Sequence, residues 1–142
     1  MQLRTEVEID APPREVWRVL ADFRAYAEWN PFITAISGDL QTGSRIAVTL
    51  GTTQGRQWTF KPTLLVVEPE RELRWLGHLW IKGLFDGEHF FSLHELDRNR
   101  TRVVHGEDFR GVLLKLMGNT LNDAARGFVG MNQALKRRVE QS

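Results

Sequence analysis

Three segments near the start of the chain decide its fold: QLRTEVEID at residues 2–10, APPREVW at 11–17 and YAEWNPF at 26–32. In the first segment the side chains alternate with a period of two, which predicts a strand with one buried face. Pro13 suits the first turn of a helix, where its missing N–H needs no partner. Val16 and Leu20 then recur at helical spacing. A second short helix or turn is expected to end before Pro31, which disfavours helix at the preceding residue.

Composition narrows the class of protein. The 142 residues include 19 Lys and Arg against 18 Asp and Glu, so the net charge is +1, and there is no cysteine. A balanced charge argues against nucleic acid as a partner, and the lack of cysteine excludes disulfides and thiol chemistry. The chain begins with a charged strand and has no apolar run of membrane-spanning length. We therefore expect a single domain over 1–142, cytoplasmic, with no integral membrane segment.

The usual motifs of cofactor and metal chemistry do not occur in the sequence. The four histidines lack a short metal-ligand spacing, and no phosphate-binding loop, dinucleotide fingerprint or nucleophile elbow is found. We accordingly expect neither a cofactor nor a metal site.

The rest of the chain predicts an antiparallel sheet followed by a long helix. Strand-like runs separated by short turns are expected at 45–50, 57–67, 73–79, 88–96 and 101–110. Pro62 interrupts the second of these runs and indicates a bulge or an irregular edge. From Leu114 to Val139 the apolar residues follow three-and-four spacing, which predicts an amphipathic helix. This order is typical of an α+β domain with its helices on one side of the sheet.

The order of these segments and several short motifs resemble the START-like superfamily (SRPBCC), in particular its bacterial polyketide cyclase/dehydrase-like branch. The matching residues are IDAP at 9–12, WNPF at 29–32, VEP at 67–69, LRWLG at 73–77, GEHFF at 87–91, EDFRG at 107–111 and GFVGMNQALK at 127–136. The resemblance implies a helix-grip fold of the birch-pollen-allergen type. In that fold a curved seven-stranded antiparallel sheet wraps around a long C-terminal helix, with two short helices after the first strand. It also implies a cavity between sheet and helix, suited to an apolar ligand.

Strand parity selects the side chains expected to face that cavity. On the last strand His105, Glu107 and Phe109 share the better inward face. On the preceding strand the pattern allows either face, and we choose the one bearing His89 and Phe91 because the resemblance favours it.

His105, Glu107 and His89 are the candidate catalytic residues, since a histidine–carboxylate pair can act as general acid or base. The alternative is a buried hydrogen bond that only completes the core. Asn132 falls within the apolar stripe of the long helix, either facing the cavity, capping a turn of backbone or serving as a satisfied amide at the helix–sheet contact. The candidate ligand-binding residues are Trp75, His89, Phe91, His105, Glu107, Phe109, Leu121 and Phe128.

Residues 79–87 contain more large apolar side chains than a solvated turn would carry. We expect a lid at the cavity mouth, with the alternative that this segment packs against a second copy of the chain or the short helices. The lid residues would be Trp80, Ile81, Leu84 and Phe85.

Three functions are consistent with the sequence. The first is binding of a hydrophobic or aromatic small molecule, lipid- or polyketide-like, which is the expected partner. The second is a cyclase, dehydratase or isomerase using the His/Glu pair. The third is a regulatory interaction module or homodimer without a small-molecule ligand. The lack of recognisable catalytic motifs favours binding over catalysis.

Overall fold

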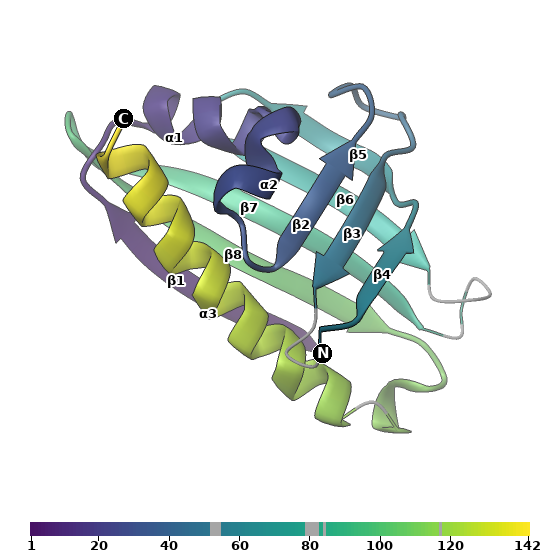
Figure 1. The fold of residues 1–142 in the computed structure, drawn as a ribbon. Coiled ribbons are helices and arrows are strands. Elements are labelled where there is room, and N and C mark those ends of the chain that lie inside the picture. The colour runs from purple at the N-terminus through teal and green to yellow at the C-terminus, as the bar shows by residue number, and fades with distance from the viewer. Residues whose placement is uncertain (52–54, 79–82, 84, 117) are drawn as a thin grey trace.

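The chain folds into two antiparallel sheets packed with a long helix (Figure 1). The computed structural model describes residues 1–51, 55–78, 83, 85–116 and 118–142. The strands are β1 (Gln2–Ile9), β2 (Ile33–Ser37), β3 (Ala47–Gly51), β4 (Gln57–Phe60), β5 (Thr63–Glu68), β6 (Glu72–His78), β7 (Asp86–Asp97) and β8 (Arg100–Arg110). The helices are α1 (Pro13–Ala21), α2 (Tyr26–Trp29) and α3 (Gly118–Glu140), with single 3₁₀ turns at Phe23–Ala25 and Leu114–Leu116.

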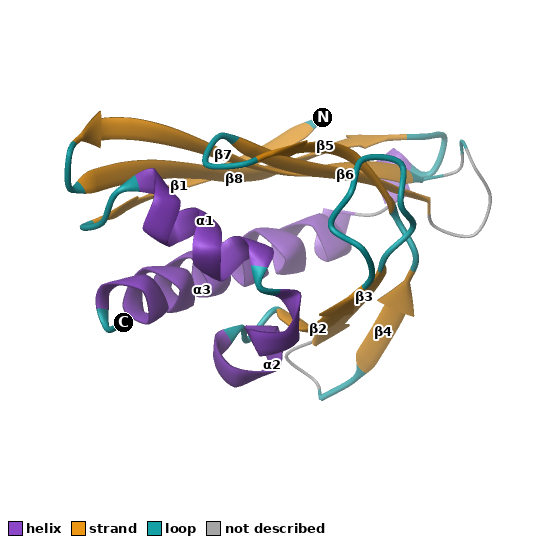
Figure 2. Cartoon of the chain, turned by 90° about the horizontal axis from the view of Figure 1, so that it is seen from above, coloured by secondary structure: helices purple, strands orange, loops and turns teal. Residues whose placement is uncertain are grey.

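The larger sheet has the strand order β1-β8-β7-β6-β5, and the smaller one has the order β2-β3-β4. All strand pairings are antiparallel. Seen from above, the helices lie on one side of the larger sheet, and the smaller sheet closes one end of the space between them (Figure 2). The helix-grip fold expected from the sequence is thereby confirmed.

The strand count differs from the seven expected, because the described residues form eight strands. The run predicted at 57–67 divides at Pro62 into β4 and β5, which belong to different sheets. Proline has no N–H to donate to a strand pairing. Its carbonyl instead accepts a hydrogen bond from the Ile46 N–H at 2.9 Å, and Arg45 and Thr63 form an isolated bridge beside it. The two sheets therefore meet at this proline.

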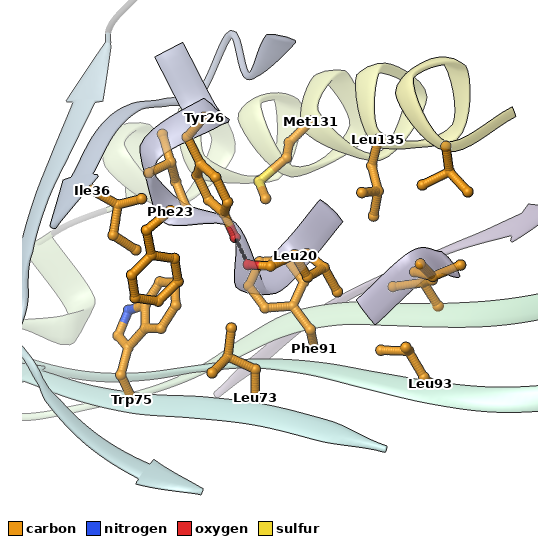
Figure 3. Close-up of a cluster of buried hydrophobic side chains, with 14 of the residues drawn as sticks. Leu20, Phe23, Tyr26, Ile36, Leu73, Trp75, Phe91, Leu93, Met131 and Leu135 are labelled. Atoms are coloured by element: carbon orange, nitrogen blue, oxygen red, sulfur yellow. Dashed lines mark hydrogen bonds between the residues drawn. The ribbon is translucent and has the colours of Figure 1, made fainter. Parts of the chain in front are cut away.

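The core lies between α3 and the larger sheet (Figure 3). Met131 of α3 is fully buried, as are Leu73 and Phe91 of the sheet. The Tyr26 hydroxyl donates to the Leu20 carbonyl at 2.6 Å, which satisfies its polar atom inside this apolar cluster. None of the helices in the described ranges is long and apolar enough to cross a membrane.

Candidate functional site

A cavity of about 280 Å³ lies between the two sheets and the N-terminal half of α3. Most of the side chains around it are apolar, and it reaches the surface at the exposed residues Trp58, His78 and Thr120. The described residues that line it are Phe32, Ile33, Val48, Leu50, Trp58, Phe60, Trp75, Gly77, His78, Phe85, Gly87, His89, Glu107, Phe109, Thr120, Ala124 and Phe128.

Paired glycines deepen the cavity on the side of the larger sheet. Gly77 of β6 and Gly87 of β7 are register partners, and both line the cavity. A Cβ at position 87 would overlap Oε2 of Glu107, so only glycine leaves room for that carboxyl. A Cβ at position 77 would instead press against the ring of Phe60, at 3.1 Å.

A chain of hydrogen bonds runs from the cavity wall into the core. Glu107 Oε1 lies 2.8 Å from His89 Nδ1, and His89 Nε2 lies 2.7 Å from His105 Nε2. His105 Nδ1 lies 2.8 Å from Asn132 Oδ1 on α3, and Asn132 Nδ2 donates to Thr5 Oγ1 on β1 at 2.8 Å. We call this series of five side chains the relay.

Aromatic rings hold both imidazoles of the relay in place. Trp75 stacks on His89 with ring centres 4.9 Å apart and planes 6° apart. His105 lies between the rings of Phe91 and Phe128, at 4.3 Å and 4.4 Å. These contacts restrict rotation of the imidazoles, so the hydrogen-bond partners of their nitrogens are fixed.

The hydrogen bonds of Thr5, at the end of the relay away from the cavity, determine which atom donates in each link. The Thr5 hydroxyl donates its single proton to the His105 carbonyl at 2.7 Å, so its oxygen must accept from the amide nitrogen of Asn132. The amide oxygen of Asn132 therefore faces His105, and the Nδ1 atom of His105 carries a proton.

Burial keeps both imidazoles uncharged. The pKa of His105 lies well below its usual value because of burial and the adjacent His89. Burial also lowers the pKa of His89 to about 3, and burial together with the nearby Asp108 raises the pKa of Glu107 to about 8. At neutral pH, His89 Nε2–H then donates to His105, and the carboxylic acid of Glu107 donates to His89 Nδ1.

These shifts predict a stability that falls with pH above about pH 6.5. In the unfolded chain Glu107 loses its proton near its ordinary pKa of 4.5, whereas the folded protein holds it until about 8, so folding becomes less favourable across this range. The shift of His89 has the opposite sign, but it acts only between about 3 and 6.5. One pH unit corresponds to about 1.4 kcal/mol. We therefore expect a loss of about 2 kcal/mol in the free energy of unfolding between about pH 6.5 and pH 8.

The matched variant for this prediction is Glu107→Gln, whose amide can replace the donor to His89 without titrating. Denaturant unfolding at a series of pH values gives the slope for each protein. An equal slope in the wild type and the variant would show that Glu107 is ionised in the folded protein at neutral pH.

The structure divides the predicted site residues into two groups. Trp75, His89, Glu107, Phe109 and Phe128 line the cavity, together with Phe85 from the predicted lid. The remaining lid residues, Trp80, Ile81 and Leu84, lie outside the described residues.

Phe91, His105 and Leu121 are buried but do not line the cavity. Phe91 stacks on His105, so both belong to the layer behind Glu107 and His89. Leu121 packs in a separate cluster with Phe85 and Phe109. Of the three outcomes considered for Asn132, the structure shows the amide satisfied at the helix–sheet contact, where it holds His105.

The sequence prediction missed Thr5 and the paired glycines. Thr5 is the register partner of His105, and it is the polar member of the predicted inward face of the first strand. A polar residue on an otherwise apolar strand face was the signal that could have identified Thr5. Gly77 lies inside the strand predicted at 73–79, where a glycine often marks a close approach, whereas Gly87 falls in the segment expected to form a lid and has no comparable signal. Across the part of the chain that the structure describes, no three His, Asp or Glu residues are placed to hold a metal ion.

Comparisons with known proteins agree with this architecture. Among curated proteins, none matches the sequence significantly. The Zhui aromatase/cyclase from a Streptomyces species superposes with a TM-score of 0.77 at 19% identity, covering 99% of this chain and 94% of that one. A START superfamily protein from Mycobacterium smegmatis gives 0.69 at 23% identity, covering 99% and 97%. A protein from Arthrobacter aurescens gives 0.78 at 16% identity, covering 99% and 87%.

At these identities the solved structures establish the fold alone. The sequence itself matches the family model described as "Polyketide cyclase / dehydrase and lipid transport" over residues 1–140. That match covers nearly the whole chain, and the chain therefore belongs to this polyketide cyclase/dehydrase and lipid transport family.

Proposed function

We propose that this protein binds a hydrophobic, aromatic small molecule in the cavity between its two sheets and α3. The observation that carries the proposal is an apolar cavity of about 280 Å³ with a carboxyl group on its inner wall. Apolar ligand surface removed from water contributes about 25 cal/mol per Å², and a few polar groups then orient the ligand. The family's description, which includes lipid transport, supports a ligand of this class.

The cavity walls favour a flat ring system over an acyl chain. Trp58 and Phe60 stack with ring centres 4.9 Å apart, and Phe85 and Phe109 stack with ring centres 5.4 Å apart. Both pairs contribute to the lining. Offset or edge contacts with such rings add about 0.5–1.5 kcal/mol per pair beyond burial of area.

Filling the cavity should weaken binding. Ala124 of α3 lines the cavity, and a phenylalanine there would occupy ligand space. Overpacking costs about 1–3 kcal/mol, so we expect Ala124→Phe to weaken the binding of naphthalene by at least about tenfold. Calorimetric titration measures the affinity, and NMR shifts of the Gly77 and Gly87 amides locate the bound probe.

Val129→Phe is the matched control, because Val129 lies on the same helix, is 50% exposed and does not line the cavity. We expect it to bind naphthalene as the wild type does. Equal affinities for the two variants, or shifts confined to residues outside the cavity, would contradict the proposed binding site.

A second candidate function is acid–base catalysis of a cyclisation or dehydration. The observation that favours it is the Glu107–His89 pair, since both residues line the cavity and share one proton. A solved structure similar to this chain is named an aromatase/cyclase, which is consistent with such a role. A bound polyketide-like ligand recovered chemically unchanged after prolonged incubation would leave binding alone as the function.

A further inference from the structure

The hydrogen bonds of the relay determine which atom donates in each link. His105 uses its Nδ1 proton on Asn132, so its Nε2 must accept a proton from His89 Nε2. One link remains, between His89 Nδ1 and Glu107 Oε1 at 2.8 Å, and this hydrogen bond requires one further proton. It belongs either to the carboxyl oxygen or to the imidazole nitrogen.

With the proton in either position, the other carboxyl oxygen of Glu107, Oε2, carries no proton. If the proton is on Oε1, Oε2 is the carbonyl oxygen of a carboxylic acid. If the proton is on His89, Oε2 belongs to a carboxylate. In each case Oε2 can accept a hydrogen bond and cannot donate one.

Oε2 is also the relay atom that a ligand can reach. It lies against Gly87 at the cavity wall, and the Glu107 side chain retains 19% exposure. Within the described ranges, the hydrogen bond and ion pair of Glu107 go through Oε1, so Oε2 is left for a ligand. Of the other polar side chains in the lining, His89 has both ring nitrogens engaged within the relay, whereas His78 and Thr120 are exposed and remain accessible to water.

We propose that the ligand carries a hydroxyl on its aromatic ring system, as a phenol or enol, and donates that hydroxyl to Glu107 Oε2. This inference rests on the proposed binding function and narrows its ligand class. A carbonyl or ether oxygen at the same point would face a second acceptor, and both would be desolvated without a hydrogen bond.

Three probes of similar shape test the inference: naphthol, its methyl ether methoxynaphthalene, and naphthalene. Calorimetric titration at neutral pH should give an affinity for naphthol about tenfold above that for the methyl ether, the size of one net hydrogen bond. The methyl ether is the more hydrophobic of the two, so partitioning into an apolar cavity alone would produce the opposite order.

Two variants assign the preference to Oε2. Glu107→Leu should remove the preference for naphthol over its methyl ether. Gly87→Ala should also reduce the preference, because the new Cβ displaces Oε2 while Glu107 itself is retained. Gly77→Ala is the control, since it changes the register partner of Gly87 in the same cavity but meets Phe60 rather than Glu107. We expect the ratio of affinities in this control to match the wild type.

The outcomes separate this inference from the function on which it rests. If the three probes bind equally well, or if the methyl ether binds most tightly, the protein is a binder but Glu107 does not select a donor. If the preference for naphthol persists in Glu107→Leu, another group recognises the hydroxyl and the inference is wrong. If no probe binds, both the proposed function and the inference fail.

Discussion

Replacing Phe128 by alanine should lower the free energy of unfolding by about 3–5 kcal/mol, the range seen for large buried aromatic residues. Phe128 is fully buried on α3 and has a ring contact with Phe32 at 5.5 Å. It also covers both imidazoles of the relay, with ring centres 4.4 Å from His105 and 5.0 Å from His89. Its removal therefore creates a void and exposes the relay to the cavity.

Denaturant unfolding measures this effect, and Val129→Ala on the exposed side of α3 is its control, with an expected change below about 0.5 kcal/mol. A loss of less than about 1 kcal/mol for Phe128→Ala would mean that the surrounding side chains collapse into the space. In that case Phe128 would not be a rigid wall of the cavity.

Replacing Asn132 by alanine should destabilise the protein by about 2–4 kcal/mol. The amide accepts from His105 and donates to Thr5, and both Asn132 and His105 are buried. The truncation removes two hydrogen bonds and leaves the Nδ1–H of His105 without a partner in the core, which costs about 1–3 kcal/mol by itself. The effect should be visible both in unfolding and in the NMR signal of that imidazole proton.

Asn122→Ala is the matched control, because Asn122 is exposed on the same helix and its replacement makes a similar change in helix propensity. The two variants should differ by the cost of breaking the relay. Equal stabilities would show that water or a shift of His105 replaces the missing amide, and the direction of the relay would then no longer be fixed.

Much of the fold follows from local patterns in the sequence. The alternation before Asp10, the proline at the start of α1 and the three-and-four spacing after Leu114 each specify an element without reference to the rest of the chain. The division of the predicted strand at Pro62 was harder to predict, because a proline in a strand pattern fits both a bulge and a break. The tertiary arrangement decides, since the Pro62 carbonyl pairs with Ile46 where the two sheets meet.

The sequence could predict which residues belong to the site, but it could not predict how they are arranged in space. Parity places His105 and Glu107 on one face of β8, yet it cannot say that Glu107 lines the cavity while His105 lies in the layer behind. That difference depends on how α3 crosses the sheet and brings Asn132 within 2.8 Å of Thr5, 127 residues away in sequence. The depth of the cavity likewise depends on Gly77 and Gly87 facing each other, a pairing that only the register reveals.

The direction of the relay also limits where a proton can travel. Its inner end is an amide and a hydroxyl that donates to a backbone carbonyl, and neither Asn132 nor Thr5 can take up an additional proton at ordinary pH. A proton that Glu107 exchanges with a bound molecule therefore has no exit through the protein interior and can leave only by way of the cavity. The relay is therefore unsuited to drawing protons from bulk water through the core, and any proton exchange at Glu107 takes place on the cavity side.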